Sequence, residues 1–250
     1  MVDSNLKFVS QRTHPRLALV HVDILESKGV LEVKAPRMSD VLHIPLQEPR
    51  VNEVLTVNVW GDEIEATEVH EDISRWFNTF LGTKDFKFVR KADHFVRKTD
   101  PKYAPKGQTA FSDGYPFLLC STESLKDLND NLEKPVSLTN FRPNIVVQGC
   151  DFAYEEDTWK KITINGLNFN VVKPCARCKM PTVDPDTGIL DSNNEPMRSM
   201  KAFRKGDEIG LDKVNPRWKG EIFFGQNLDH ESNEEGLVLH VGQVCTVEKK

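Results

Sequence analysis

The sequence predicts a β-rich α+β protein with a β-barrel core and helices at its edge. Two observations indicate this class: many short stretches have the alternating pattern of strands, and few have the apolar period of a helix. The chain of 250 residues is long enough for a sizeable core, as one large domain or two small ones. Its hydrophobic fraction of 38% and charged fraction of 28% are typical of a soluble globular protein.

Strands dominate the first half of the chain. Residues 17–25 are predicted to form a strand, and a turn at 27–29 connects it to a second strand at 30–33. Glu71 to Leu81 should form a helix, because its large apolar side chains share one face and Gly82 follows it. The other strands of this half are expected at 41–44, at 55–60, near Ile64 and at 86–90.

The second half mixes loops, helices and strands. Residues 91–110 carry mixed charge and little periodicity, so we expect a loop. Ser121 should cap a helix over 121–132. A hairpin is predicted over 162–172, since Asn165-Gly166 favours the positive φ angles of a type I′ turn. The remaining predictions are strands at 144–148, 221–227 and 237–248 and a short helix at 196–204.

The segment that follows this hairpin, residues 174–181 (PCARCKMP), concentrates the chemistry. Cys175 and Cys178 stand three positions apart with Arg177 between them. The thiolate is the form that binds metals and attacks electrophiles, and adjacent cations favour it. The pair is expected at the end of a strand or on the loop after it.

Four interpretations of the cysteine pair are open. A structural zinc site needs four ligands, and no second C-x-x-C motif is present. A thioredoxin-like couple needs a helix after the first cysteine, whereas Pro181 and Pro185 follow here. The third interpretation is two ordinary cysteines in a loop. The fourth is a single thiolate bound to a soft or redox metal within an anionic cofactor, with cations and planar donors nearby.

Other segments offer such partners. Arg142 suits bidentate phosphate contacts and Asn144 provides both a donor and an acceptor, although a surface salt bridge and a turn amide would also explain them. Asp113 precedes a glycine in a turn that is either plain or part of a site. Gly225 indicates a close ligand approach or a strand bulge. Residues 184–188 should form a rigid turn, because a calcium loop would need glycine at its sixth position.

Charge and cysteine usage exclude several classes. A net charge of −5 argues against general nucleic-acid binding, which usually requires a basic face. Five cysteines, an odd number, favour a reduced intracellular compartment over a disulfide framework. We find no signal peptide and no run of about 18–20 apolar residues, so no membrane span is expected.

Together these segments resemble the MOSC-domain family, in particular its amidoxime-reducing branch (mitochondrial amidoxime reducing component-like). The segments that carry the resemblance are 8–17 (FVSQRTHPRL), 112–118 (SDGYPFL), 140–147 (NFRPNIVV), 149–150, 175–188 (CARCKMPTVDPDTG), 195–196 and 224–226. The resemblance implies a MOSC β-barrel core with peripheral helices over 86–250. It also implies an N-terminal β-barrel-like subdomain over 1–85.

The resemblance further implies a pterin-based molybdenum cofactor, with Cys178 as the protein ligand to molybdenum. Asp113 matches a turn that faces the metal and is expected to relay protons as a second catalytic residue. Ala176 replaces a serine that is common in the family. Three positions match those that hold the pterin and its phosphate: Arg142, Asn144 and Arg177.

The implied activity is the reduction of N-hydroxylated substrates, such as amidoximes and hydroxylamines. Electrons would come from NADH through a flavin reductase and a b-type cytochrome. The implied location is the mitochondrial outer membrane, although the chain as it stands reads as soluble and cytoplasmic. One alternative is a sulfurtransferase with a persulfide on Cys178, and another is a non-catalytic, truncated cofactor-binding product. Pyridoxal phosphate binding belongs to the wider family only, because no lysine here lies in a recognisable motif for it.

One departure from the family pattern is expected. The chain is expected to start within a later strand and to lack the family's N-terminal segment, with its anchor, first strand and cations that hold the cofactor. A missing barrel strand would expose a sheet edge. We therefore expect reduced cofactor affinity and lower stability.

Overall fold

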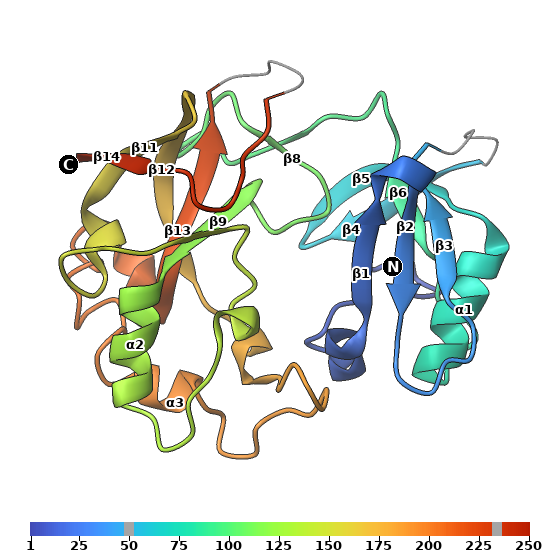
Figure 1. Ribbon diagram of the computed structural model, residues 1–250, viewed down its shortest axis with the longest axis horizontal. Coiled ribbons are helices and arrows are strands. Elements are labelled where there is room, and N and C mark those ends of the chain that lie inside the picture. The colour runs from blue at the N-terminus through green and yellow to red at the C-terminus, as the bar shows by residue number, and fades with distance from the viewer. Residues whose placement is uncertain (48–52, 232–236) are drawn as a thin grey trace. The chain divides into compact units, whose positions relative to one another are not determined.

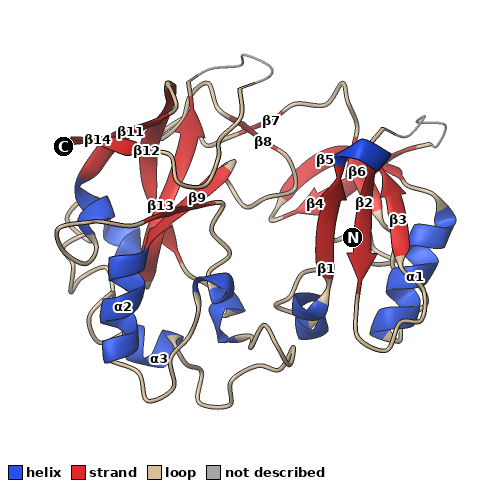
Figure 2. Ribbon diagram, viewed as in Figure 1, coloured by secondary structure: helices blue, strands red, loops and turns tan. Residues whose placement is uncertain are grey.

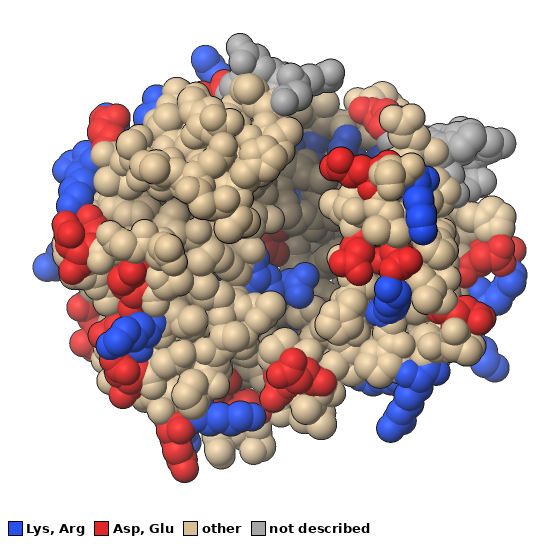
Figure 3. Space-filling model, in the orientation of Figure 1, with Lys and Arg blue, Asp and Glu red and all other residues tan. Residues whose placement is uncertain are grey.

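The computed structural model describes residues 1–47, 53–231 and 237–250 (Figure 1). Strands greatly outnumber helices among them, which confirms the predicted β-rich α+β class (Figure 2). The chain divides into an N-terminal unit, residues 1–96 with 183–190, and a C-terminal unit, residues 97–182 with 191–250. The predicted domain boundary between residues 85 and 86 stays a prediction. Basic and acidic side chains are interspersed over the face shown in Figure 3.

Among the residues that the structure describes, the N-terminal unit contains two three-stranded antiparallel sheets and one α-helix. The first sheet has the order β1 (His21–Leu25), β2 (Val30–Lys34), β3 (Leu42–Pro45). The second has the order β4 (Val54–Val59), β5 (Asp62–Glu68), β6 (Val89–Lys91). The helix is α1 (Glu71–Leu81).

The helix α1 has the predicted bounds. Its buried face presents Ile73, Trp76, Phe77 and Phe80 to a core that includes strands β2 and β3. Gly82 ends the helix at a φ of 71°, a left-handed conformation that glycine adopts without a steric penalty. The spacing of four apolar residues and one glycine therefore accounts for the whole element.

A six-stranded sheet organises the C-terminal unit, in the order β10-β9-β13-β12-β11-β14. These strands are β9 (Phe117–Ser121), β10 (Ile145–Val147), β11 (Trp159–Ile164), β12 (Leu167–Ala176), β13 (Phe223–His230) and β14 (Cys245–Lys249). The unit also contains β7 (Arg97–Lys98), β8 (Gln108–Thr109), α2 (Thr122–Asp130) and α3 (Met197–Met200). The 3-10 helices within the described part of the chain are Pro15–Leu19, Glu26–Lys28, Leu138–Asn140, Glu155–Thr158, Met180–Thr182 and Pro216–Trp218.

Two apolar cores flank this sheet. One gathers residues of β9, β11, β12 and β13, including Leu119, Ile162 and Leu228, all fully buried. The other contains fully buried Cys120 and Phe224, together with residues of α2 and α3. The sheet is therefore a layer between two packed faces, and the ends of its strands are the positions open to a ligand.

Local sequence signals predicted several of these elements. The hairpin of β11 and β12 turns at Asn165 and Gly166, whose φ angles are 50° and 78°. Ser121 caps α2, with its Oγ accepting the N–H of Ser124 at 3.1 Å. The 184–188 segment is a tight turn, in which Asp184 Oδ1 accepts the N–H groups of residues 186 and 187 at 2.9 and 3.0 Å.

Other predictions need correction. Residues 17–19 belong to a 3-10 helix and not to the predicted strand, because Pro15 starts a helical turn. The predicted strand at 86–90 is shifted to β6, and the loop at 91–110 contains the short pair β7 and β8. The predicted helix at 196–204 is helical only in α3. Of 237–248, only the part in β14 is a strand, and residues 232–236 lie outside the described ranges. Strand β9 was not predicted, because the four apolar residues at 117–120 show no alternation.

Candidate functional site

The register of the six-stranded sheet places the predicted site segments, before β10 and after β12, at the same level along the strand direction. Pro174 near the end of β12 pairs with Gln226 of β13. Gln226 pairs with Leu119 of β9, which pairs with Ile145 at the start of β10. The end of β12 and the start of β10 are therefore level and separated by three strand spacings, or about 14 Å. Contact between the loops at these two strand ends therefore requires long side chains that reach across this distance.

A β-bulge shapes the end of β12. The register shifts between Pro174 and Ala176, where one additional residue of β13 is accommodated. Gly225 lies in this bulge with a φ of 77°. A Cβ atom there would lie 2.7 Å from Cys120 Sγ and 2.7 Å from the Leu119 carbonyl oxygen. The bulge and this close approach of β9 explain the glycine, so no ligand contact is needed to account for it.

Arg177 points into the protein and joins two segments. Its Nη1 donates to Cys175 Sγ at 3.1 Å, and its Nη2 donates to the Phe141 carbonyl oxygen at 2.8 Å. Its Nε is buried without a hydrogen-bond partner among the described residues. Burial opposes the charge, but the thiols of Cys175 and Cys120 favour it, and the pKa of Arg177 is raised overall. A protonated guanidinium thus connects the cysteine loop to the backbone beside Arg142.

Arg142 occupies the turn before β10 in a left-handed conformation, with a φ of 59°. Such a conformation costs a non-glycine residue about 1–3 kcal/mol and is concentrated at functional sites. Its backbone N–H donates to the Leu138 carbonyl oxygen at 3.1 Å, and its side chain is exposed. Desolvation by neighbouring atoms lowers the pKa of Arg142, but an arginine keeps its proton. The result is an exposed cation on a turn fixed by its own backbone.

The two asparagines of the same segment have structural partners. Asn144 pairs twice with Leu118: its N–H donates to the Leu118 carbonyl oxygen at 2.9 Å, and its Oδ1 accepts the Leu118 N–H at 2.9 Å. Its Nδ2 group therefore remains as the donor that a heterocycle would use. Asn140 is buried, and its Nδ2 donates to the Pro181 carbonyl oxygen at 3.1 Å. The sequence did not single out Asn140, although it lies inside the quoted motif.

The thiols near Arg177 differ in accessibility. Cys178 follows β12 and is half-buried, and its Sγ accepts the Met180 N–H at 3.4 Å. Cys175 is buried at the end of β12, and Cys120 is fully buried on β9. Burial raises the pKa of Cys120. Cys178 is therefore the thiol of this group that is best placed to meet a ligand.

Asp113 lies apart from these contacts on the turn before β9. It is exposed, and its turn is held by buried Arg97, whose Nη1 donates to the carbonyl oxygens of Ala110 and Ser112 at 2.9 and 2.7 Å. Within the described ranges, no hydrogen bond or ion pair connects Asp113 with the cysteine loop. The structure thus joins the Arg142 and Cys178 segments but leaves Asp113 unconnected to them.

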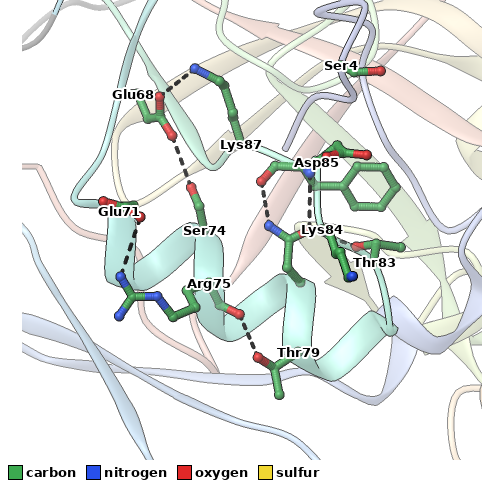
Figure 4. A pocket seen from close by; sticks show the side chains of 12 residues that line it. Ser4, Glu68, Glu71, Ser74, Arg75, Thr79, Thr83, Lys84, Asp85 and Lys87 are labelled. Carbon is green, nitrogen blue, oxygen red and sulfur yellow. Dashed lines mark hydrogen bonds and ion pairs between the residues drawn. The ribbon is translucent and has the colours of Figure 1, made fainter.

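A pocket of about 600 Å³ lies elsewhere, wholly within the N-terminal unit (Figure 4). It is bounded by α1 and residues 83–87, and most of the residues that line it have polar or charged side chains. Lys87 pairs with Glu68 at 2.8 Å, and the Arg75 guanidinium pairs with Glu71 at 3.4 Å. These groups satisfy one another, and none of the residues predicted for the site lines this pocket. The candidate site is therefore the region at the start of β10 and the end of β12.

Two family models match the chain and correspond to this architecture. Residues 106–246 match the MOSC domain, and residues 1–84 match the MOSC N-terminal beta barrel domain. The chain belongs to the MOSC domain family. In this MOSC protein, the segments with Arg142 and Cys178 both lie within the matched MOSC domain.

Among curated proteins, this MOSC protein is 37% identical to the human mitochondrial amidoxime-reducing component 1. The alignment has 211 residues, 83% of this chain and 61% of that relative. It is 36% identical to the human mitochondrial amidoxime reducing component 2, over 83% of this chain and 62% of the relative. Component 1 of Xenopus laevis is 33% identical, over 94% of this chain and 66% of the relative. The chain thus spans somewhat less than two thirds of the length of these relatives.

The match over residues 1–84 corrects the expectation that the family's N-terminal segment is lacking. The first residues are integrated into the N-terminal unit: the Val2 N–H donates to the Lys87 carbonyl oxygen and the Phe8 N–H to the Asn58 carbonyl oxygen, each at 2.9 Å. The reduced cofactor affinity and lower stability expected from that absence are withdrawn. Among the helices of the described residues, none has the length and apolar character needed to cross a membrane.

Proposed function

We propose that this MOSC protein is a molybdenum-cofactor-dependent oxidoreductase that reduces N-hydroxylated substrates such as amidoximes and hydroxylamines. The observation that carries the proposal is the half-buried thiol of Cys178, which lies next to Arg177 in the cysteine loop. Arg177 connects this loop to the segment of Arg142, because it donates a hydrogen bond to the Phe141 carbonyl oxygen. The names of its relatives support the same reaction class, because they describe amidoxime-reducing components.

The donor set in this region fits an anionic, metal-containing cofactor. A half-buried thiol offers a soft ligand, and the Nε of Arg177 is buried with no hydrogen-bond partner in the described part of the chain. Arg142 adds an exposed, permanently charged guanidinium, which suits phosphate recognition. A buried, unpartnered donor is unfavourable unless a ligand or water satisfies it. The site therefore has both the ligand type and the unsatisfied hydrogen-bonding capacity that such a group requires.

Each residue has a proposed role. Cys178 would provide the protein's thiolate ligand, Arg142 and Arg177 would offset the negative charge of the pterin phosphate, and the Nδ2 of Asn144 would donate to the pterin. When bound, the cofactor supplies two-electron redox chemistry at the metal. Asp113, exposed on its turn, would accept and deliver the protons that the reduction consumes.

The source of electrons and the location belong to the same proposal. We propose that a b-type cytochrome, itself reduced by an NADH-dependent flavin reductase, delivers the electrons. The relatives named above are described as mitochondrial. We propose the same organelle for this protein, at its outer membrane.

Metal analysis of the Cys178→Ser variant tests the ligand assignment. Protein made in a host that synthesises the cofactor should contain about one molybdenum per chain, and Cys178→Ser should lose most of it, because a hydroxyl replaces the soft ligand. Cys245→Ser is the matched control, since Cys245 lies on edge strand β14, two strands away from β12. Full molybdenum content in Cys178→Ser would refute the assignment.

Turnover tests the reaction class separately. The loaded protein should reduce benzamidoxime to benzamidine with dithionite as a chemical electron source, which removes any need for a partner. Absence of turnover in a molybdenum-replete protein would refute the proposed activity. A labile sulfane sulfur on Cys178 in molybdenum-free protein would favour the sulfurtransferase alternative.

A further inference from the structure

An aromatic pair fixes a lysine close to the candidate site. Tyr103 stacks on Trp218 with ring centroids 6.0 Å apart and an interplanar angle of 24°. The Nζ of Lys173 lies 5.2 Å from the Tyr103 centroid and 5.8 Å from the Trp218 centroid. Cation–π contacts of this kind hold an ammonium group in one orientation. Segments that are far apart in the sequence therefore meet around one positive charge.

Further cations lie next to this pair, in space or in the sequence. Lys102 Nζ lies 5.1 Å from the Tyr103 centroid, and Arg217 and Lys219 flank Trp218 in the sequence; all three are exposed. We name Lys102, Lys173, Arg217 and Lys219 the basic cluster. Within residues 1–47, 53–231 and 237–250, none of these four forms an ion pair.

The nearby acidic groups do not neutralise the basic cluster. Asp100 accepts the backbone N–H of Lys102 at 3.0 Å, not its ammonium group. Asp207, which lies within the field of Lys219, is already paired with Lys205 at 3.1 Å. Four cations that form no ion pair among the described residues, on a chain of net charge −5, are a local feature that composition alone does not reveal.

The basic cluster borders the chemistry because Lys173 is two residues before Cys175 on β12. Two residues of a strand span about 7 Å. A molecule docked on the basic cluster would therefore lie beside the strand end that carries the cysteine loop. Electron transfer requires such proximity, whereas a small neutral substrate gains nothing from four cations at this position.

We propose that the basic cluster is the docking surface for an electron-donating protein with an acidic face. The inference rests on the proposed function and names the surface that serves it. Opposite charges accelerate encounter and orient the partner, and this effect suits short-lived complexes of redox proteins. The aromatic pair favours a protein partner, since it pre-organises Lys173 for a complementary surface. Binding to an anionic membrane would depend only on the number of positive charges and not on their orientation.

The test measures binding of the full chain to a soluble acidic b-type cytochrome domain. Ionic strength is raised from about 0.01 to about 0.15 M, which shortens the Debye length from about 30 to about 8 Å. The variant Lys102→Glu/Lys219→Glu is compared with Lys126→Glu/Lys160→Glu, which makes the same change in net charge at exposed positions outside the cluster. We expect a Kd at least about tenfold higher for the cluster variant at low ionic strength, and a change within about twofold for the control.

Three outcomes would overturn the proposal. If both double variants weakened cytochrome binding equally, net charge alone would explain the effect. If the unmodified protein did not bind the cytochrome at low ionic strength, the proposed partner would be excluded. Selective loss of binding to vesicles of phosphatidylcholine and phosphatidylserine, with cytochrome binding unchanged, would assign the cluster to a membrane instead. Because binding is measured without turnover, these results are separate from the dithionite assay that tests the proposed function.

Discussion

Substitution of Gly225 by alanine tests how the end of β12 is built. This glycine combines two constraints: a φ of 77°, and a position where a Cβ atom would lie 2.7 Å from both Cys120 Sγ and the Leu119 carbonyl oxygen. The second neighbour is backbone of β9 and cannot rotate away. Gly225→Ala must therefore strain its own backbone and also separate β13 from β9.

The two contributions have different sizes. A left-handed conformation costs a residue with a Cβ atom about 1–2 kcal/mol. Insertion of a methyl group into a packed core costs about 1–3 kcal/mol. We therefore expect Gly225→Ala to lower the free energy of unfolding by about 2–5 kcal/mol. If the free energy of unfolding decreases by about 2–3 kcal/mol per molar urea, the urea concentration at the midpoint of unfolding should fall by about 1–2 M.

A second glycine isolates the backbone contribution. Gly166, at the hairpin turn between β11 and β12, has a φ of 78°, and a Cβ atom there would meet nothing within 4 Å. Gly166→Ala should therefore cost only the conformational part, about 1–2 kcal/mol. Urea unfolding followed by far-UV circular dichroism measures both variants. Equal losses for Gly166→Ala and Gly225→Ala would refute the argument that close packing against β9 requires the glycine.

Two further substitutions test buried charges. Arg177→Lys should lower the free energy of unfolding by about 1–3 kcal/mol, because a lysine cannot bond Cys175 and Phe141 together, and an unchanged urea midpoint would contradict this role. Burial raises the pKa of Glu156 above the 4.5 of an unperturbed glutamate, so its contribution to stability is present below about pH 4.5 and is lost as pH rises through the folded-state pKa. Glu156→Gln should remove that part of the pH profile of thermal unfolding, and a profile that keeps its slope would show that another group causes it.

Local signals in the sequence were sufficient for elements whose stability is local. Helix α1 follows from apolar spacing and Gly82, and the β11–β12 hairpin follows from Asn165 and Gly166. The position of Cys175 at a strand end was predictable for the same reason, since the hairpin sets where β12 runs. In each case the decisive residues lie within about ten positions of one another.

Long-range pairing could not be predicted in the same way. Strand β9 is a short apolar run that becomes a central strand only because β10 and β13 pair with it on either side. Arg177 was expected to contact an anion, but the structure shows that it also binds Cys175 and the carbonyl oxygen of Phe141. The second contact spans 36 positions of sequence and crosses several strands. No periodicity or spacing rule contains that information.

The different hydrogen bonding of Cys178 and Arg177 separates metal binding from stability at this site. Cys178 accepts one long hydrogen bond on its Sγ, at 3.4 Å, so its replacement by serine should change the free energy of unfolding by no more than about 1 kcal/mol. Arg177 instead joins two segments, because both of its terminal nitrogens donate hydrogen bonds. If the proposed function is right, Cys178→Ser loses metal in a protein of nearly normal stability, whereas Arg177→Lys loses both stability and metal. A cysteine variant that unfolded as readily as the arginine variant would mean that Cys178 serves the fold, and the case for it as a metal ligand would lose its structural basis.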